Sequence, residues 1–201
     1  EIRSAALAAV DVLAEAGATI VSTTVPGAKE AKEANGIVLV GEAFAYHRND
    51  LAERWGEYGN QTRLALARGA LLGAQDYAQA NRFRSWFRRQ VAAVFEEVDV
   101  LLVPGWPTTA LPADQFNAER MVNSPSFTGQ WNLTGMPGLT APSGLASDGL
   151  PMSIQLVGRP FEEATLLRVA DVYQHSTDHH LLAPPGALRG IGTAASAAVG
   201  G

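Results

Sequence analysis

The spacing of apolar residues along the chain alternates between the helical and the strand period, which predicts an α/β architecture. Apolar residues at helical spacing predict a first helix from Ile2 that ends at Gly17, because glycine commonly follows the last helical residue. Further helices are predicted over residues 28–35, 37–55, 60–67, 76–98, 126–134 and 162–175. Runs of β-branched and other apolar residues predict strands over 19–25, 99–103, 139–141 and 152–157.

Two of these segments indicate how the sheet is built. Residues 99–103 form a continuous apolar run that stops at Pro104, which is typical of a central strand buried between two helix layers, as in a parallel sheet. Asp148 and Gly149 lie between the last two predicted strands and favour a tight turn that joins them. Four prolines between residues 104 and 125 predict a long irregular loop, and such loops often carry function.

Composition narrows the possible functions. The chain is 47% apolar and 17% charged, so it can build a packed core. Its net charge of −5 leaves no basic excess to neutralise phosphates, and no nucleic-acid partner is expected. The chain contains no cysteine, which excludes disulfides and thiolate chemistry within it. No apolar run approaches the ~18 residues of a membrane span, so we expect a cytoplasmic protein without membrane contacts.

The chain shows no self-contained catalytic or metal motif. No serine has glycine two residues before and after it, as the nucleophile elbow of many hydrolases requires. Ser143 and His180 therefore remain a remote alternative for an unrecognised hydrolase. Asp178, His179 and His180 are adjacent in sequence and cannot share one helix face, so no metal site is expected.

The stretch over residues 127–173 carries a specific series of motifs. In order, it contains Phe127-Thr128, Trp131-Asn132-Leu133-Thr134-Gly135-Met136-Pro137-Gly138, Ala141-Pro142-Ser143-Gly144, Asp148-Gly149-Leu150-Pro151 and Gln155-Leu156-Val157-Gly158-Arg159-Pro160-Phe161. This series closely resembles the C-terminal region of the amidase signature family. The upstream residues Glu42, His47, Tyr58, Arg63 and Gly69 also fit, so the resemblance covers residues 1–185.

The resemblance implies a hydrolase of linear amides without a cofactor, folded as one α/β domain with a mixed β-sheet flanked by helices on both faces. It also implies a serine nucleophile, a second serine in a cis peptide and a lysine base. The chain contains no Ser-Ser pair, and its two lysines, Lys29 and Lys32, lie in a polar segment. We therefore expect no catalytic residue here. Residues 1–185 are expected to be the C-terminal portion of one amidase domain, inactive alone, and residues 186–201 a flexible Gly/Ala-rich tail.

Within the family, this portion is expected to supply walls of the substrate pocket. Phe127, Trp131 and Gly135 on one segment, with Trp106 in the proline-rich loop, are the predicted substrate-binding residues. For both tryptophans the alternative is a packing role in the core. Gly105-Trp106 and Gly129-Gln130 depart from the residues common in the family, so the identity of the amide is not implied. His47, Thr134 and Arg159 are expected to be structural.

The expected partners are a small-molecule amide and an N-terminal part of the same enzyme that this chain lacks. An exposed sheet edge left by that part predicts association, and we expect a homo-oligomer. No segment typical of the tRNA-dependent amidotransferase branch is evident, which disfavours that branch. The alternative function is a non-catalytic binding or assembly module on an amidase-like scaffold.

Overall fold

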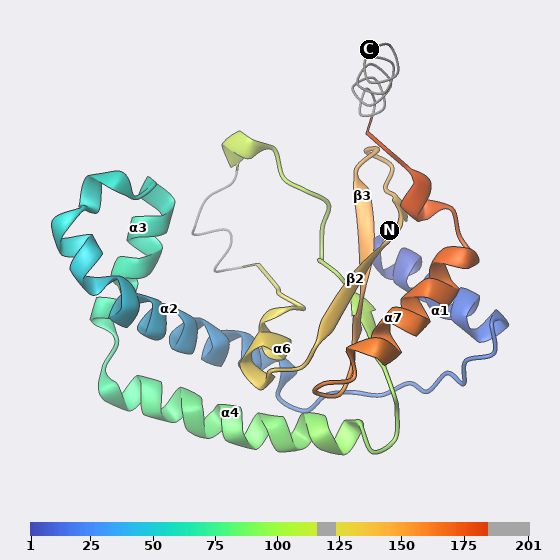
Figure 1. Ribbon diagram of the computed structural model, residues 1–201, viewed down its shortest axis with the longest axis horizontal. Coiled ribbons are helices and arrows are strands. Elements are labelled where there is room, and N and C mark those ends of the chain that lie inside the picture. The colour runs from blue at the N-terminus through green and yellow to red at the C-terminus, as the bar shows by residue number, and fades with distance from the viewer. Residues whose placement is uncertain (116–123, 185–201) are drawn as a thin grey trace, which may run out of the picture.

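The computed structural model describes residues 1–115 and 124–184, so the predicted tail over 186–201 lies outside the described residues. Helices alternate with strands, which confirms the predicted α/β class (Figure 1). The helices are α1 (Ile2–Glu15), α2 (Ala28–Glu53), α3 (Asn60–Ala67), α4 (Ala74–Val94), α6 (Gly129–Thr134) and α7 (Glu163–His175). Short 3-10 helices are η1 (Trp55–Glu57), η2 (Arg68–Leu71), η3 (Ala113–Gln115) and η4 (His179–Leu181). The strands are β1 (Leu101–Pro104), β2 (Gly138–Leu145) and β3 (Pro151–Val157).

The predicted turn at Asp148 and Gly149 is confirmed. The Leu150 backbone N–H donates to Asp148 Oδ1 at 3.0 Å, and Gly149 has a φ of 77°, a left-handed conformation that glycine adopts without strain. This turn joins β2 and β3 into an antiparallel hairpin. The turn residues and the apolar strands on either side of them therefore both favour this hairpin.

Strand β1 completes a sheet in the order β1-β3-β2, and both pairings are antiparallel. The prediction that residues 99–103 form the central strand is therefore wrong for the described sheet, in which β3 is central and β1 lies at an edge. No parallel pair occurs among the described strands. An apolar run indicates that a strand is buried on both faces. It does not indicate which strands pair with it, because strand order is set by tertiary contacts.

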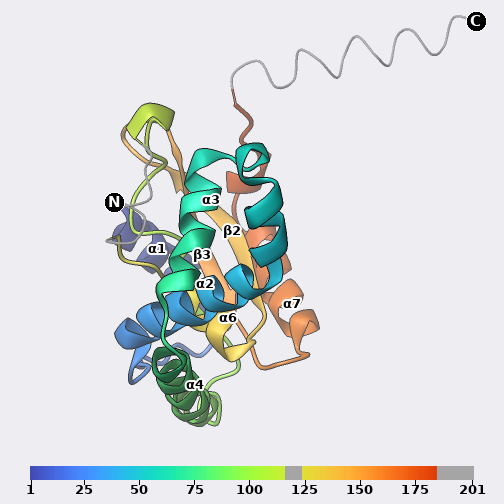
Figure 2. The ribbon, with the colours of Figure 1, turned by 90° about the vertical axis from the view of Figure 1, so that its left-hand side faces the viewer.

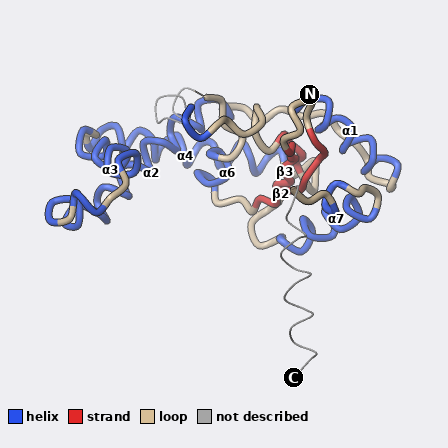
Figure 3. The backbone as a smooth tube through the Cα atoms, turned by 90° about the horizontal axis from the view of Figure 1, so that it is seen from above, coloured by secondary structure: helices blue, strands red, loops and turns tan. Residues whose placement is uncertain are grey.

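Helices cover both faces of the sheet, as predicted. Leu101 and Val157 are paired across β1 and β3 and contribute to the core that α2, α4 and α6 share. Leu102 and Leu156, the next pair, point to the opposite face and pack with α1 and α7. Figure 3 shows the result: α1 and α7 lie beside the sheet, while α2, α3 and α4 extend away from it. In Figure 2, α2 and α3 lie in front of the sheet, towards the viewer.

Residues 19–25 do not form the predicted strand. They run as irregular chain, and the side chains of Ile20 and Val21 are 48% and 50% exposed. β-branched composition favours an extended chain, but a strand also needs a neighbour that takes up its backbone hydrogen bonds. No such neighbour exists within the described ranges.

Two predicted helices, over 28–35 and 37–55, form the single helix α2. Gly36 does not interrupt it, because the buried residues Ala31, Ala34 and Val38 pack against α4 and α6 on either side of that glycine. Helix α4 ends at Val94 rather than near residue 98, with the chain turning into β1. No helix in the described part of the chain is both long and apolar enough to cross a membrane.

Candidate functional site

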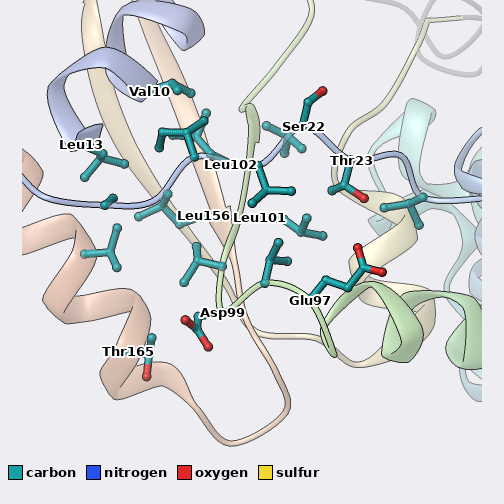
Figure 4. A pocket seen from close by; sticks show the side chains of 18 of the residues that line it. Val10, Leu13, Ser22, Thr23, Glu97, Asp99, Leu101, Leu102, Leu156 and Thr165 are labelled. Carbon is teal, nitrogen blue, oxygen red and sulfur yellow. The ribbon is translucent and has the colours of Figure 1, made fainter. Parts of the chain in front are cut away.

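A cavity of about 1040 Å³ lies along the outer edge of β1. We call it the β1 groove. Figure 4 shows Leu101 and Leu102 of β1 along it, with Ser22 and Thr23 of the segment after α1 near one end and Thr165 of α7 near the other. Side chains from both faces of the sheet line the groove because β1 is an edge strand, and α6 contributes to the wall on its own face.

The structure brings two of the four predicted substrate-binding residues to the groove. Phe127 and Trp131 line it, from the segment that leads into α6 and from α6 itself. Trp106 follows β1, is 39% exposed and is not among the lining residues. Gly135 is also outside the lining and ends α6 with a φ of 76°, which accounts for glycine there without any contact to a ligand.

Trp131 serves the core as well as the groove wall. Its side chain is only 4% exposed and belongs to the cluster that also contains Ala31, Phe87 and Leu133. The two roles that the sequence left open are therefore compatible at this position. Its indole Nε1 is buried and has no hydrogen-bond partner among the described residues.

Local hydrogen bonds fix the short helix α6 in place. The Thr134 hydroxyl donates to the carbonyl oxygens of Gln130 and Trp131, at 2.9 and 3.1 Å, which fits the predicted structural role of Thr134. Ser126 Oγ accepts from the backbone N–H of Thr128 at 3.3 Å and from that of Gly129 at 3.4 Å. Side-chain hydrogen bonds to the backbone thus hold α6 in place, although the helix is too short to be stabilised by its backbone hydrogen bonds alone.

Gln130 is a residue that functional reasoning from sequence missed. Its side chain is 6% exposed and lines the groove. Nε2 donates to the Ser126 carbonyl at 3.2 Å, whereas Oε1 is buried without a partner in the described structure. The only signal in the sequence was the departure from family residues at Gly129-Gln130.

Arg159 is structural, as predicted, and lies at the start of the turn after β3. Its guanidinium donates to the Phe95 carbonyl and, at 3.0 Å, to the Val98 carbonyl, and pairs with Asp99 at 3.2 Å and Glu162 at 3.5 Å. These contacts hold the turn between α4 and β1 against α7, so Arg159 fixes one end of the β1 groove.

His47 also fits a structural role. Its Nδ1 is 3.0 Å from the Tyr58 hydroxyl, a hydrogen bond that ties α2 to the segment before α3. Desolvation, with the nearby charge of Asp50, raises the pKa of Tyr58 above its ordinary value. The pair lies outside the groove lining.

The remaining chemical groups of residues 1–115 and 124–184 do not assemble into a second site. Ser143 is buried and its Oγ has no partner within residues 1–115 and 124–184, so no general base activates it there. Lys29 is exposed, whereas Lys32 is half-buried, with its Nζ 3.8 Å from Glu33 Oε1. Lys32 is therefore less solvated than the sequence suggested. Among the described residues, no group of three or more His, Asp or Glu is placed to hold a metal ion.

Sequence comparison decides the family. The amidase family model matches residues 1–167, a span that includes the β1 groove, α6 and the β2–β3 hairpin. The chain belongs to the amidase family. The resemblance inferred from the motifs between Phe127 and Tyr173 is thereby confirmed.

Relatives within the amidase family carry two kinds of name. An amidase from Pseudomonas putida is 36% identical over 90% of this chain. A glutamyl-tRNA(Gln) amidotransferase subunit from Chloroflexus aggregans is also 36% identical, over 91% of this chain. The sequence analysis disfavoured the tRNA-dependent amidotransferase branch. This equal identity does not support that argument. The chain spans 40% of the first relative and 42% of the second.

A solved structure extends the comparison to the fold. The structure comes from work on a vestigial protein complex and the evolutionary origins of an s-triazine catabolic enzyme. It matches 87% of this chain with a TM-score of 0.75 and 26% identity, and the match covers 39% of that chain. The arrangement of helices around the sheet is therefore shared with an experimentally determined relative.

Proposed function

We propose that this chain is the C-terminal portion of an enzyme that hydrolyses a linear carboxylic amide to an acid and ammonia or an amine. The amidase family match over residues 1–167 carries this proposal. The reaction is acyl transfer to an activated serine, followed by hydrolysis of the acyl-enzyme. The chain itself supplies scaffold and pocket walls, with Phe127 and Trp131 as the apolar surfaces against the acyl group.

The nucleophile, its base and the oxyanion site belong to the remainder of the proposed parent enzyme. Two observations support this division. The chain spans about two fifths of the relatives it matches, and it contains neither paired serines nor a lysine beside a serine. None of the described strands pairs with the outer edge of β1, which suits packing against another part of the same enzyme.

A second candidate is the amide-hydrolysing component of a tRNA-dependent amidotransferase. The observation in its favour is the Chloroflexus aggregans relative, whose identity to this chain equals that of the Pseudomonas putida amidase. In that case the amide nitrogen would pass to the glutamyl-tRNA(Gln) that the relative's name gives as acceptor. Glutaminase turnover that requires added partner proteins distinguishes this candidate from a self-sufficient amidase.

The test is ammonia release from a panel of aliphatic and aromatic amides, with glutamine included. We expect the full-length parent to release ammonia and the 201-residue chain to release none above background. A parent without turnover on any amide, alone or with partner proteins, would favour the non-catalytic module instead. Turnover by the short chain that Ser143→Ala abolishes would place the nucleophile in this chain and overturn the division of roles.

A further inference from the structure

One bulky residue adopts a backbone conformation that usually belongs to glycine. Phe161 has a φ of 65°, and it is the one non-glycine residue with a positive φ within residues 1–115 and 124–184. It is the third residue of a turn that the Glu162 N–H closes by donating to the Arg159 carbonyl at 3.1 Å. Pro160 at the second position and a positive φ at the third are features of a type II turn, where glycine or asparagine usually fills the third position. A phenylalanine in that position strains the backbone.

The side chain of Phe161 makes up for none of this strain within the described chain. It is 93% exposed, the highest exposed fraction among the large apolar side chains of the described residues. A single exposed apolar residue is ordinary and by itself indicates no partner. Here the exposure coincides with the strain, so glycine would serve the fold of the described chain better. Strained residues persist where a contact requires them, which points to a contact of Phe161 outside the described chain.

The turn that carries Phe161 is held in place at both ends. At its first residue, the Arg159 guanidinium donates to the carbonyl oxygens of Phe95 and Val98, on the segment between α4 and β1. The same guanidinium pairs at 3.5 Å with Glu162, the last residue of the turn, and α7 begins directly afterwards. The ring is therefore presented in a fixed position, which lowers the entropy lost when a partner binds it.

The turn lies at one end of the β1 groove. Its last residue, Glu162, lines the groove, and Figure 4 shows Asp99 and Thr165 at that end, although Phe161 itself is not among the lining residues. No described strand pairs with the outer edge of β1. The chain spans only 40% and 42% of two relatives that it matches. A further part of the parent enzyme that packs along this edge therefore comes close to the turn.

We propose that Phe161 is a docking anchor, whose ring enters an apolar pocket on the remaining part of the parent enzyme. This inference rests on the proposed function, because it takes the chain to be the C-terminal portion of a longer amidase. Moving the exposed ring out of water into such a pocket is favourable and offsets the strain of the turn. That balance accounts for phenylalanine where glycine is unstrained. A ring that sits on a second copy of the protein instead is one outcome of the test.

Oxidative footprinting of the full-length parent tests the anchor without any substitution. Hydroxyl radicals oxidise exposed phenylalanine rings, and mass spectrometry of the digested protein gives the rate at Phe161. An isotope-labelled peptide over residues 155–168, added to the same solution, provides the rate of a fully exposed ring. We expect Phe161 to be oxidised about tenfold more slowly than the peptide, because a ring in a desolvated pocket keeps less than about a tenth of its accessible surface. Equal rates would overturn the proposal.

Dilution distinguishes the two occupants of the contact. Protection by another part of the same chain does not depend on protein concentration, whereas protection by a second copy is lost when the copies separate. The footprinting is therefore repeated at a concentration at which light scattering finds only the monomer. Protection that persists supports the proposal. Protection that disappears would assign the ring to a second copy and overturn it.

Two substitutions in the parent separate the effect of the ring from that of the strain. Phe161→Gly relieves the backbone but removes the ring, whereas Phe161→Leu, the matched control, keeps the strain and much of the apolar surface. We expect Phe161→Gly to lower the urea midpoint of unfolding, and Phe161→Leu to leave the midpoint closer to that of the unaltered protein. A midpoint that rises with Phe161→Gly would show that nothing contacts the ring, and the anchor would be wrong.

Failure of the anchor is separable from failure of the proposed function, because neither footprinting nor unfolding measures turnover. If the parent hydrolyses amides while Phe161 is oxidised like the free peptide, only the anchor is lost. If Phe161 is protected in a parent that hydrolyses no amide, the anchor stands and the proposed function is wrong.

Discussion

Arg159 and the Gln130–Trp131 pair all carry polar groups and are partly or wholly buried. They differ in whether those groups have hydrogen-bond partners. The Arg159 guanidinium meets two carbonyl oxygens and two carboxylates, all from its own chain. Gln130 Oε1 and Trp131 Nε1 meet nothing in the described structure. Arg159 joins the α4–β1 turn to α7, whereas the pair lies on the wall of a cavity.

The contrast separates polar groups that the described chain satisfies from polar groups that it leaves unpaired. A group that stabilises the fold is satisfied by residues of that fold, and its removal leaves other buried groups unpaired. A group that binds a ligand is unsatisfied until the ligand arrives, so its removal costs recognition more than stability. Substitutions at these positions should therefore divide into those that lower the free energy of unfolding and those that change binding.

The largest effect is expected from Trp131, whose ring packs in the core and lines the β1 groove. Trp131→Ala removes a nearly fully buried ring from the core, and we expect the free energy of unfolding to fall by about 3–5 kcal/mol. Urea denaturation followed by circular dichroism measures it. Trp106→Ala, at a 39% exposed side chain, is the control and should cost less than about 1 kcal/mol. A Trp131→Ala loss as small as the control would show that the ring is not part of the core.

The next largest effect is expected at Arg159. Arg159→Met keeps the aliphatic stem but strips the Phe95 and Val98 carbonyls of their donors, and we expect a loss of about 2–3 kcal/mol in the free energy of unfolding. Arg159→Lys should recover little of it, because an ammonium cannot reach divergent acceptors as a planar guanidinium does. Full rescue by lysine in the same denaturation experiment would mean that charge alone, rather than the fork of donors, holds the turn.

A smaller effect on folding is expected at Gln130, in direct contrast to Arg159. Gln130→Met gives up the hydrogen bond to the Ser126 carbonyl but also removes the unpaired Oε1, so the two effects oppose each other. We expect the free energy of unfolding to change by less than about 1 kcal/mol in either direction. A loss as large as that of Arg159→Met would place Gln130 among the structural groups and erase the contrast.

The smallest effect is expected at Asp148, which also accepts hydrogen bonds only from its own chain. The Leu150 N–H and the Thr109 hydroxyl both donate to it and hold the pKa of its carboxyl below the ordinary 3.8. The carboxylate therefore adds stability that is fully present above that ordinary value and is lost as the pH falls below it. The stability difference between the unaltered protein and Asp148→Asn should shrink in acid titrations below about pH 4. A constant difference down to about pH 2 would count against this account.

Local sequence predicted those parts of the fold that local chemistry controls. The turn at Asp148-Gly149, the glycines that end α1 and α6, and helix α7 were all predicted because the determining residues are neighbours in the chain. The strand over 19–25 and the central place of residues 99–103 were wrong because both depend on which segments lie alongside. The same limit applies to the site. Phe127 and Trp131 were predicted through family motifs and line the β1 groove, but the unpaired Gln130 Oε1 is visible only once its neighbours are placed.

The central claim is that the parent enzyme hydrolyses amides through a nucleophile that this chain does not carry. Trapping the acyl-enzyme tests that claim most directly. The full-length parent is mixed with an aromatic amide that it hydrolyses, quenched in acid, digested, and examined by mass spectrometry, with hydroxylamine as the competing nucleophile. The account predicts an acyl adduct on a serine outside Glu1–Gly201, and a hydroxamate when hydroxylamine is present. An adduct on a serine within Glu1–Gly201, Ser143 above all, would contradict it.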